Sequence, residues 1–206
     1  MSRFEAKSVL SHSYGCIMAP FGEDVTRRVH QLAASIPDEF IYNDDTEEYG
    51  RQEGVHVTVK YGLHTSDVEE VVAGVSGWPP LNVVLGRTSV FHGDNDYVVL
   101  KLSAQSRDLV SLNRHVSRTF EVTDAYPDYN PHVTIAYLVK NPKDPYYYRE
   151  FYTDEFQGQV EEIDELEFSP ADGPSEFFPL TGSSDEFQAM QLLDMARDVI
   201  GDTDAL

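Results

Sequence analysis

The sequence is poor in several residue types, and each shortage excludes something. It has one cysteine, Cys16, so no intrachain disulfide can form, which fits a reducing cytosol. It contains no apolar run of the length that spans a bilayer. Its start, MSRFEAKSVLSHSYG, lacks the apolar core of a signal peptide. We therefore expect a cytoplasmic protein with no membrane partner, in which Cys16 is a strand residue of the core rather than a nucleophile.

Positive charge is also scarce. The 206 residues include 15 Lys and Arg against 36 Asp and Glu, so the formal net charge is −21 at pH 7. Attraction to phosphates dominates non-specific binding of nucleic acids, so we expect no long DNA or structured RNA as a partner. A small anionic ligand in a locally positive pocket is compatible with this charge.

The order of the predicted elements indicates an α+β fold with antiparallel sheets. Apolar segments bounded by turn-forming residues predict strands, and apolar residues at helical spacing predict helices. Strands are expected at 13–21, 54–64, 81–93, 96–104, 130–139, 159–170 and 175–182, and helices at 22–36, 66–75, 103–120 and 183–201. Residues 1–182 are expected to form a single bilobal domain, and residues 183–206 a C-terminal amphipathic helix extension.

One short phrase occurs twice. GVHVTVKYGLH occupies residues 54–64 and NPHVTIAYLV occupies residues 130–139. Both contain His-Val-Thr followed by an aliphatic residue, and both have tyrosine at the sixth position counted from the histidine. Alternate side chains of a strand share a face, so each strand should present a His/Thr pair on one side. The two pairs are His56 with Thr58 and His132 with Thr134.

Two such pairs, brought together by a pseudo-twofold axis, suit the cleavage of a phosphodiester bond. One neutral imidazole can accept a proton from the attacking oxygen, and the other, protonated, can donate one to the leaving oxygen. The threonine hydroxyls can donate to the non-bridging phosphate oxygens. We therefore expect these four residues to be catalytic, with a bell-shaped dependence of rate on pH. Two histidines are too few to hold zinc, so we expect no metal and no cofactor.

A simpler interpretation stays open, in which both phrases are half-buried strands whose histidines only make structural hydrogen bonds. A third match of this kind, RHVSR around His115, lies on a predicted helix. There the histidine and the serine would not share a face, so His115 is expected to be a helix-surface residue.

The paired phrases resemble those of the 2H phosphoesterase superfamily. The segments HSYGCIMAPF, HVTVKYGLH, DYVVLKL and YPDYNPHVTIAYL are most similar to the phage anti-CBASS protein 1 group, over about residues 10–140. The resemblance implies a bilobal fold of two antiparallel sheets with flanking helices and a pseudo-twofold repeat of the His-x-Thr strands. It also implies metal-independent cleavage of 3′–5′ bonds in cyclic di- and trinucleotide immune messengers, as a viral counter-defence in the host-cell cytoplasm. It fades beyond Lys140.

Three further residues are candidates for substrate binding. The resemblance implies that Tyr14 stacks on a base of the ligand, although an ordinary core tyrosine is the alternative. Lys60 is expected to share the face of His56 and to neutralise phosphate charge, unless it is a surface lysine at a strand edge. Phe91, near the turn FHGDND, is a second candidate for base stacking, and one of the phenylalanines of SEFFPLTG is a third.

Two other functions are compatible with the sequence. One is a phosphodiesterase that processes 2′,3′-cyclic phosphates or 2′–5′ linkages at RNA ends, and the other is a non-catalytic protein that sequesters cyclic nucleotides. The acidic surface favours a small substrate, and the two intact His/Thr pairs favour an enzyme. The attacking group, a ribose 2′-hydroxyl or water, and the oligomeric state stay open. From their length and tyrosine content, loops 37–54 and 141–158 are expected to cover the site.

Overall fold

The computed structural model describes residues 14–44, 49–75, 77–93, 95–123, 128–141 and 147–183. The C-terminal helix expected within 183–206 falls outside them, apart from its first residue. The described elements, in chain order, are β1 (Gly15–Pro20), α1 (Glu23–Ser35), η1 (Asp38–Phe40), β2 (His56–Leu63), α2 (Val68–Val75), β3 (Leu81–His92), β4 (Tyr97–Gln105), α3 (Arg107–Thr119), β5 (His132–Val139), η2 (Arg149–Phe151), β6 (Val160–Ile163), β7 (Glu165–Ser169) and β8 (Glu176–Pro179).

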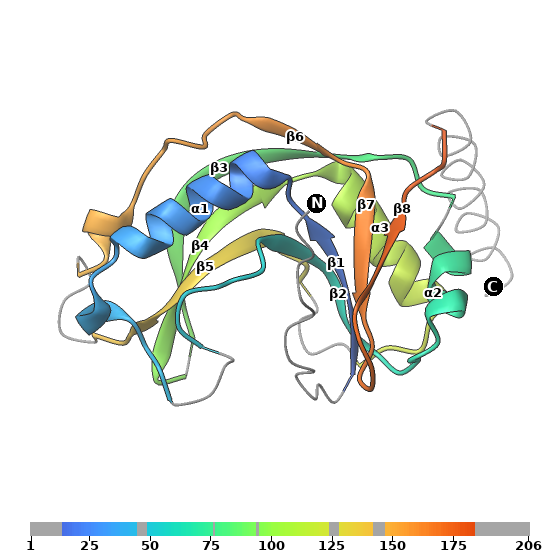
Figure 1. Cartoon of the computed structure of the whole chain (residues 1–206), viewed down its shortest axis with the longest axis horizontal. Coiled ribbons are helices and arrows are strands. Elements are labelled where there is room, and N and C mark those ends of the chain that lie inside the picture. The colour runs from blue at the N-terminus through green and yellow to red at the C-terminus, as the bar shows by residue number, and fades with distance from the viewer. Residues whose placement is uncertain are drawn as a thin grey trace, which may run out of the picture.

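The strands of the described residues form one curled antiparallel sheet, in the order β6-β3-β4-β5-β2-β1-β7-β8 (Figure 1). The expectation of two separate sheets is therefore wrong. The sheet has two halves of four strands, and β2 and β5 join them through one register pair, Val57 opposite Val133. Each expected lobe thus supplies half of a single sheet, and the two repeated phrases lie side by side at the joint.

The two halves repeat the same local order. In the first half β1, α1 and β2 follow one another, and in the second half β4, α3 and β5 do the same. Both helices contact the other half, because α1 packs against β5 and α3 packs against β2 as well as against β3 of its own half. This reciprocal packing ties the halves together where the strands themselves share only one register pair.

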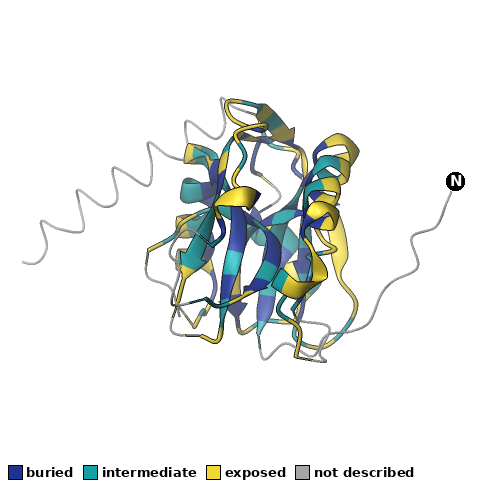
Figure 2. Ribbon diagram, turned by 90° about the vertical axis from the view of Figure 1, so that its left-hand side faces the viewer, coloured by how far each residue is buried: buried dark blue, intermediate teal, exposed yellow. Residues whose placement is uncertain are grey.

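The two long helices are amphipathic and cover one face of the sheet. Their buried positions recur every three or four residues, as the core face of a helix requires. These positions are Val25, Val29 and Ala33 in α1 and Leu109, Leu112 and Val116 in α3. Ser106 caps α3 by accepting a hydrogen bond from the backbone N–H of Leu109. Figure 2 shows exposed residues on the outer sides of the helices and buried residues along the strands. No helix among the described residues is long and apolar enough to cross a membrane.

The segment 159–170, expected as one strand, forms two. β6 pairs with β3 at one end of the sheet, whereas β7 pairs with β1 in the other half. The chain crosses between the halves at this point (Figure 1). β7 and β8 then form the expected hairpin.

The two expected covering loops are integral parts of the fold where the structure describes them. Residues 41–44 and 49–52 lie beside β5, where Ile41 pairs with Leu138 and Arg51 pairs with Ala136. Three backbone hydrogen bonds hold them there, from Tyr42 N to Tyr137 O, from Gln52 N to Ile135 O and from Tyr137 N to Gly50 O. In the second loop, Tyr148, Phe151 and Phe156 are buried in the core.

Candidate active site

The two His/Thr pairs meet on one face of the sheet, at the joint between its halves. Val57 lies opposite Val133, and both are buried in the core. Opposite residues of an antiparallel pair project to the same face, and their neighbours project to the other. The register therefore sets the histidine of each strand across from the threonine of the other. The facing pairs are His56 with Thr134 and Thr58 with His132. We call the half-exposed face that carries them the open face.

Each of the two strands contains a bulge directly after its threonine. The extra residue is Val59 in β2 and Ile135 in β5, where the registers with β1 and β4 shift by one residue. A bulge places two residues against one and reverses the alternation of side chains beyond it. The repetition in the sequence is therefore also a repetition of backbone geometry.

The bulge corrects the expected position of Lys60. Lys60 lies opposite the core residue Ile17 and is only 5% exposed, so it projects to the helix-covered face and not to the face of His56. Uninterrupted alternation from His56 would place Tyr61 on the core side, but this tyrosine is 40% exposed and lies opposite Cys16. In β5 the equivalent reversal places Tyr137 on the open face.

Both histidine rings bond the backbone two residues earlier. Nδ1 of His132 lies 2.8 Å from the carbonyl oxygen of Asn130, and His56 hydrogen-bonds the backbone of Gly54. A carbonyl oxygen only accepts, so Nδ1 of His132 carries the proton. This leaves Nε2 of His132 as the nitrogen that can exchange a proton with a ligand.

The environment of the two rings favours their neutral forms. Burial, followed by the charge of His132, lowers the pKa of His56 to about 4, although the hydrogen bond with Gly54 acts in the opposite direction. Burial also lowers the pKa of His132, the hydrogen bond with Asn130 raises it, and the charge of Lys101 lowers it. The charge of His132 therefore acts on the protonation of His56.

Lys101 is a candidate site residue that the sequence analysis missed. It lies in β4 opposite Thr134, beside the bulge, and is only 8% exposed. Its Nζ lies 3.9 Å from the ring centroid of Phe91, and burial lowers the pKa of this lysine. Among the described residues no carboxylate forms an ion pair with it. Lys101 is therefore a partly desolvated cation close to His132 and Thr134, where it can bind an anion.

Phe91, a candidate for base stacking, contacts two other side chains near the repeated phrases. Its ring meets that of His132 edge to face at a centroid distance of 4.9 Å, and it lies beneath the ammonium of Lys101. Phe91 therefore supports the imidazole and the cation in this structure. Whether it also stacks on a base stays a prediction.

Tyr14 lies away from the joint, where β1 begins. Its ring stacks on His64 at 5.1 Å and meets Tyr61 edge to face at 6.2 Å. Because Tyr61 is on the open face, these rings border that face at its β1 end. The role of Tyr14 in stacking on a base remains a prediction.

Donors outside β2 and β5 form hydrogen bonds with backbone carbonyls of the two repeated phrases. Tyr129 Oη donates to the carbonyl of Thr58 across the joint, at 2.9 Å. The carbonyl of the bulge residue Val59 accepts from Asn113 Nδ2 of α3 at 2.7 Å, and the carbonyl of Ile135 accepts from the backbone N–H of Gln52. Both bulge carbonyls thus have donors from outside their own sheet pairings, which stabilises the irregular backbone.

The single cysteine lies beside the site, hydrogen-bonded with Thr58. Burial, followed by the charge of Glu167, raises the pKa of the Cys16 thiol to about 12. A thiol with such a pKa is protonated at neutral pH and is a poor nucleophile. This agrees with the expectation that Cys16 is not a catalytic residue.

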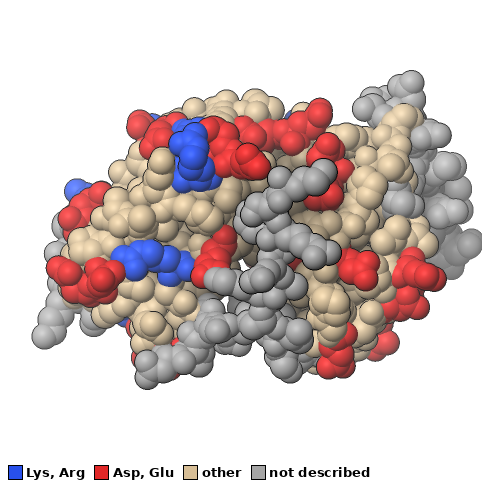
Figure 3. Space-filling view, viewed as in Figure 1, with Lys and Arg blue, Asp and Glu red and all other residues tan. Residues whose placement is uncertain are grey.

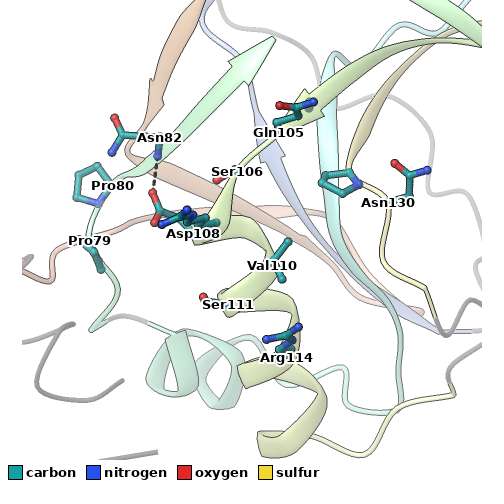
Figure 4. A pocket seen from close by; sticks show the side chains of 13 residues that line it. Pro79, Pro80, Asn82, Gln105, Ser106, Asp108, Val110, Ser111, Arg114 and Asn130 are labelled. Carbon is teal, nitrogen blue, oxygen red and sulfur yellow. Dashed lines mark hydrogen bonds between the residues drawn. The ribbon is translucent and has the colours of Figure 1, made fainter. Parts of the chain in front are cut away.

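A separate hollow of about 780 Å³ lies at the start of α3. Figure 4 shows Arg114 and Val110 of α3 on one side of it and Asn130 on another. Asp108, which also lines it, accepts a hydrogen bond from the backbone N–H of Asn82. Neither histidine of the repeated phrases lines this hollow, so it is not the site. In the described residues no group of three or more His, Cys, Asp and Glu side chains is arranged to hold a metal ion.

Comparison with known proteins places this arrangement in a family. The profile of the 2′-5′ RNA ligase superfamily matches residues 18–169, which include both His/Thr pairs. The chain belongs to this superfamily. Its members, the 2H phosphoesterases, are phosphodiesterases and related phosphoesterases. No curated protein sequence matches the chain.

The structure of TT0787 shows the same fold at low sequence identity, and two other solved structures are less similar. The protein TT0787 of Thermus thermophilus is 13% identical, with a TM-score of 0.59 over 82% of this chain and 99% of that chain. E. coli LigT complexed with 3′-AMP is 16% identical, with a TM-score of 0.46 over 82% and 94%. Kluyveromyces marxianus Usb1 with uridine monophosphate is 11% identical, with a TM-score of 0.46 over 83% and 100%. At these identities the likeness concerns the fold alone.

Proposed function

We propose that this superfamily member cleaves the 3′–5′ phosphodiester bonds of small cyclic oligonucleotides, with the cyclic di- and trinucleotide messengers of antiviral defence as its substrates. The observation that carries the proposal is the register at the joint, which sets two His/Thr pairs on one face with each histidine across from a threonine. The resemblance of the extended motifs supports the choice of substrate.

The two histidines divide the proton transfers between them. Because the pKa of His56 is lowered to about 4, and the charge of His132 contributes to that shift, the first proton taken up by the pair goes to His132. His56 then stays neutral and acts as the base that accepts a proton from the attacking hydroxyl. His132 acts as the acid that donates a proton to the leaving oxygen. A bound phosphodiester anion raises the pKa of both rings and so keeps His132 charged nearer to neutral pH.

The remaining groups bind the phosphate. The hydroxyls of Thr58 and Thr134 donate to the two non-bridging oxygens, where negative charge increases in the transition state. The ammonium of Lys101 lies opposite Thr134 and compensates that charge. This set supplies an acid, a base and a cation from side chains alone, so we propose that the reaction needs no metal.

The bond changes are the same for either attacking group. The attacking oxygen, a ribose 2′-hydroxyl or water, loses its proton to His56 and forms a bond to phosphorus. The bond from phosphorus to the leaving ribose oxygen breaks, and that oxygen takes the proton of His132. Attack by the 2′-hydroxyl gives a 2′,3′-cyclic phosphate, and attack by water gives a linear monoester. A substrate without the 2′-hydroxyl distinguishes the two routes, because only the water route cleaves it at a normal rate.

The charge of the chain favours a short substrate. Acidic side chains are spread over the face shown in Figure 3, with Lys and Arg in few places. Such a surface repels a long polyanion, whereas a small ring with two or three phosphates can enter the site and meet the locally positive Lys101.

A second enzymatic function shares the same site. The name of the family, 2′-5′ RNA ligase superfamily, refers to RNA. It supports an alternative function, the processing of 2′,3′-cyclic phosphates or 2′–5′ linkages at RNA ends. The same histidines would serve as acid and base there. A protein that only sequesters cyclic nucleotides is a third possibility, and it predicts binding without turnover.

One experiment distinguishes cleavage of cyclic oligonucleotides, processing of RNA ends and sequestration without cleavage. The protein is incubated with EDTA and either cyclic dinucleotides, cyclic trinucleotides or short RNAs that end in a 2′,3′-cyclic phosphate, and the products are resolved by chromatography. We expect cleavage of the cyclic oligonucleotides, loss of cleavage in His56→Ala with binding retained, and normal cleavage in His30→Ala, whose histidine is exposed on α1. Cleavage of the RNA ends alone would establish the alternative, and binding without cleavage by the wild type would establish the third possibility.

A further inference from the structure

The sixth position of the repeated phrase is tyrosine in both strands, and the catalytic scheme does not use it. The bulges turn both tyrosines to the open face, where Tyr61 is exposed and Tyr137 half-exposed. β2 and β5 are antiparallel, so the two tyrosines lie in opposite directions from the joint. Because one of the intervening residues is the bulge residue, each tyrosine lies three register steps from the central Val57 or Val133, which corresponds to about 10 Å along a strand. The His/Thr pairs therefore lie between two tyrosines.

Tyr137 belongs to a cluster of four tyrosines on the open face. Its ring meets Tyr49 at a centroid distance of 5.1 Å and Tyr97 at 5.2 Å, and Tyr49 meets Tyr97 at 5.0 Å. Tyr42 lies 5.3 Å from both Tyr49 and Tyr97. We call these four residues the tyrosine cluster. Tyr97 and Tyr137 come from strands, whereas Tyr42 and Tyr49 come from residues 41–44 and 49–52, which are hydrogen-bonded to the edge of β5.

The cluster is not part of the core. All four residues are half-exposed, and none belongs to the buried set that fills the helix-covered face. Four aromatic rings in mutual contact on the same face as the two histidines form a fixed apolar surface with hydroxyls at its margin. Aromatic surfaces of this kind stack on nucleobases, because every base has a flat π-face.

We propose that the tyrosine cluster binds a nucleobase next to the scissile phosphate, on the β5 side of the joint. Tyr61 and Tyr14 border the open face on the opposite side, where a second base has a similar surface. The ligand that fits both surfaces has bases on both sides of the phosphate at the histidines. This inference deepens the proposed function, and it favours ligands with at least two bases over a single nucleotide that carries a 2′,3′-cyclic phosphate.

The test measures binding in the inactive His56→Ala protein, so that turnover does not enter the result. The ligands are a 3′,3′-cyclic dinucleotide with two adenines and the analogue in which one adenine is replaced by hydrogen. The variants are Tyr49→Ala, Tyr49→Phe and, as a matched control, Tyr152→Ala, which removes an exposed tyrosine outside the cluster. Tyr49 comes from the loop segment, and thermal unfolding shows whether each variant is folded.

We expect Tyr49→Ala to bind the dinucleotide about tenfold to hundredfold more weakly than the control, and Tyr49→Phe to bind it normally because the ring is kept. The analogue that lacks one adenine keeps a single base, which can occupy either surface, so Tyr49→Ala should weaken its binding less than it weakens binding of the dinucleotide. Equal affinity of Tyr49→Ala and the control for the dinucleotide, or an equal loss for both ligands, would overturn the inference.

Cleavage by the wild type and binding by the variants test the proposed function and the base-binding site separately. If the wild-type protein fails to cleave the dinucleotide while the effects of Tyr49→Ala on binding appear as expected, the catalytic proposal fails and the base-binding site stands. If cleavage occurs and the effects on binding do not appear, the base-binding site fails and the catalytic proposal stands.

Discussion

The lowered pKa of His56 makes folding stability depend on pH in a way that one substitution can isolate. In the folded chain the pKa of His56 is about 4, against an ordinary value of 6.5. Between these values the unfolded chain binds a proton that the folded chain does not. The stability is therefore at its full value above pH 6.5, and it is lost as the pH falls toward 4. His56→Gln removes this titration and keeps a polar side chain of similar size.

The size of the effect follows from the shift. A difference of one pKa unit corresponds to about 1.4 kcal/mol, so the imidazole lowers the free energy of unfolding by about 2 kcal/mol at pH 5 and by about 3 kcal/mol at pH 4. Other groups titrate in this range, but they do so in the wild type and the variant alike. The comparison of the two proteins isolates the contribution of His56.

The assay is urea unfolding of both proteins at pH 7.5 and pH 5, followed by circular dichroism. We expect the wild type to lose about 2 kcal/mol more than His56→Gln over this interval. His30→Gln serves as the control, because this histidine is exposed on α1 and should leave the loss unchanged. Equal losses in the wild type and His56→Gln would show that His56 is not held in its neutral form by the fold, and the assignment of His56 as the base would lose its basis.

Three further predictions concern catalysis and folding. Plotted against pH, kcat/KM should be bell-shaped with its maximum on the acid side of 6.5, since both imidazoles have lowered pKa values in the free protein; a maximum above pH 8 would contradict the scheme. Lys101→Met should reduce kcat/KM about tenfold to hundredfold and move the alkaline limb of the profile to higher pH, because it removes a charge that lowers the pKa of His132. An unchanged alkaline limb would argue against a role of Lys101 beside His132. Arg27→Met, at an exposed position, is the control. Gly62→Ala should lower the free energy of unfolding by at least about 2 kcal/mol, because φ is +101° and the added Cβ would lie 2.2 Å from the carbonyl oxygen of Thr123. In the matched control Gly77→Ala, the added Cβ meets open space. Equal unfolding midpoints of the two variants would refute the reasoning.

Local patterns predicted the described α-helices and strands up to β5 in their order, and strand alternation predicted the faces of His56, Thr58, His132 and Thr134. Strand periodicity works for His56 and Thr58 because they precede the bulge, and it fails for Lys60 and Tyr61 because they follow it. Nothing in HVTVKY indicates that Val59 is an extra residue. The bulge depends on the register with β1 and on the donor that Asn113 supplies from α3, and both are long-range features.

The same limit explains the other corrections. The sheet is single because β2 and β5 share one register pair, which local patterns do not contain. The segment 159–170 reads as one alternating strand, yet its halves bond to β3 and β1 at opposite parts of the sheet. Lys101 was missed because DYVVLKLSA has the ordinary pattern of a buried strand. Its proximity to His132 arises only when β4 pairs with β5.

The central claim is that two histidines, one from each half of the sheet, cleave a phosphodiester bond together. The most direct measurement is single-turnover cleavage of a cyclic dinucleotide in EDTA by the wild type, His56→Ala, His132→Ala and the double variant. We predict that each single variant loses about 100-fold to 10,000-fold in rate and that the double variant loses much less than the product of the two, because the pair acts as a unit. Unchanged cleavage by either single variant would contradict the claim.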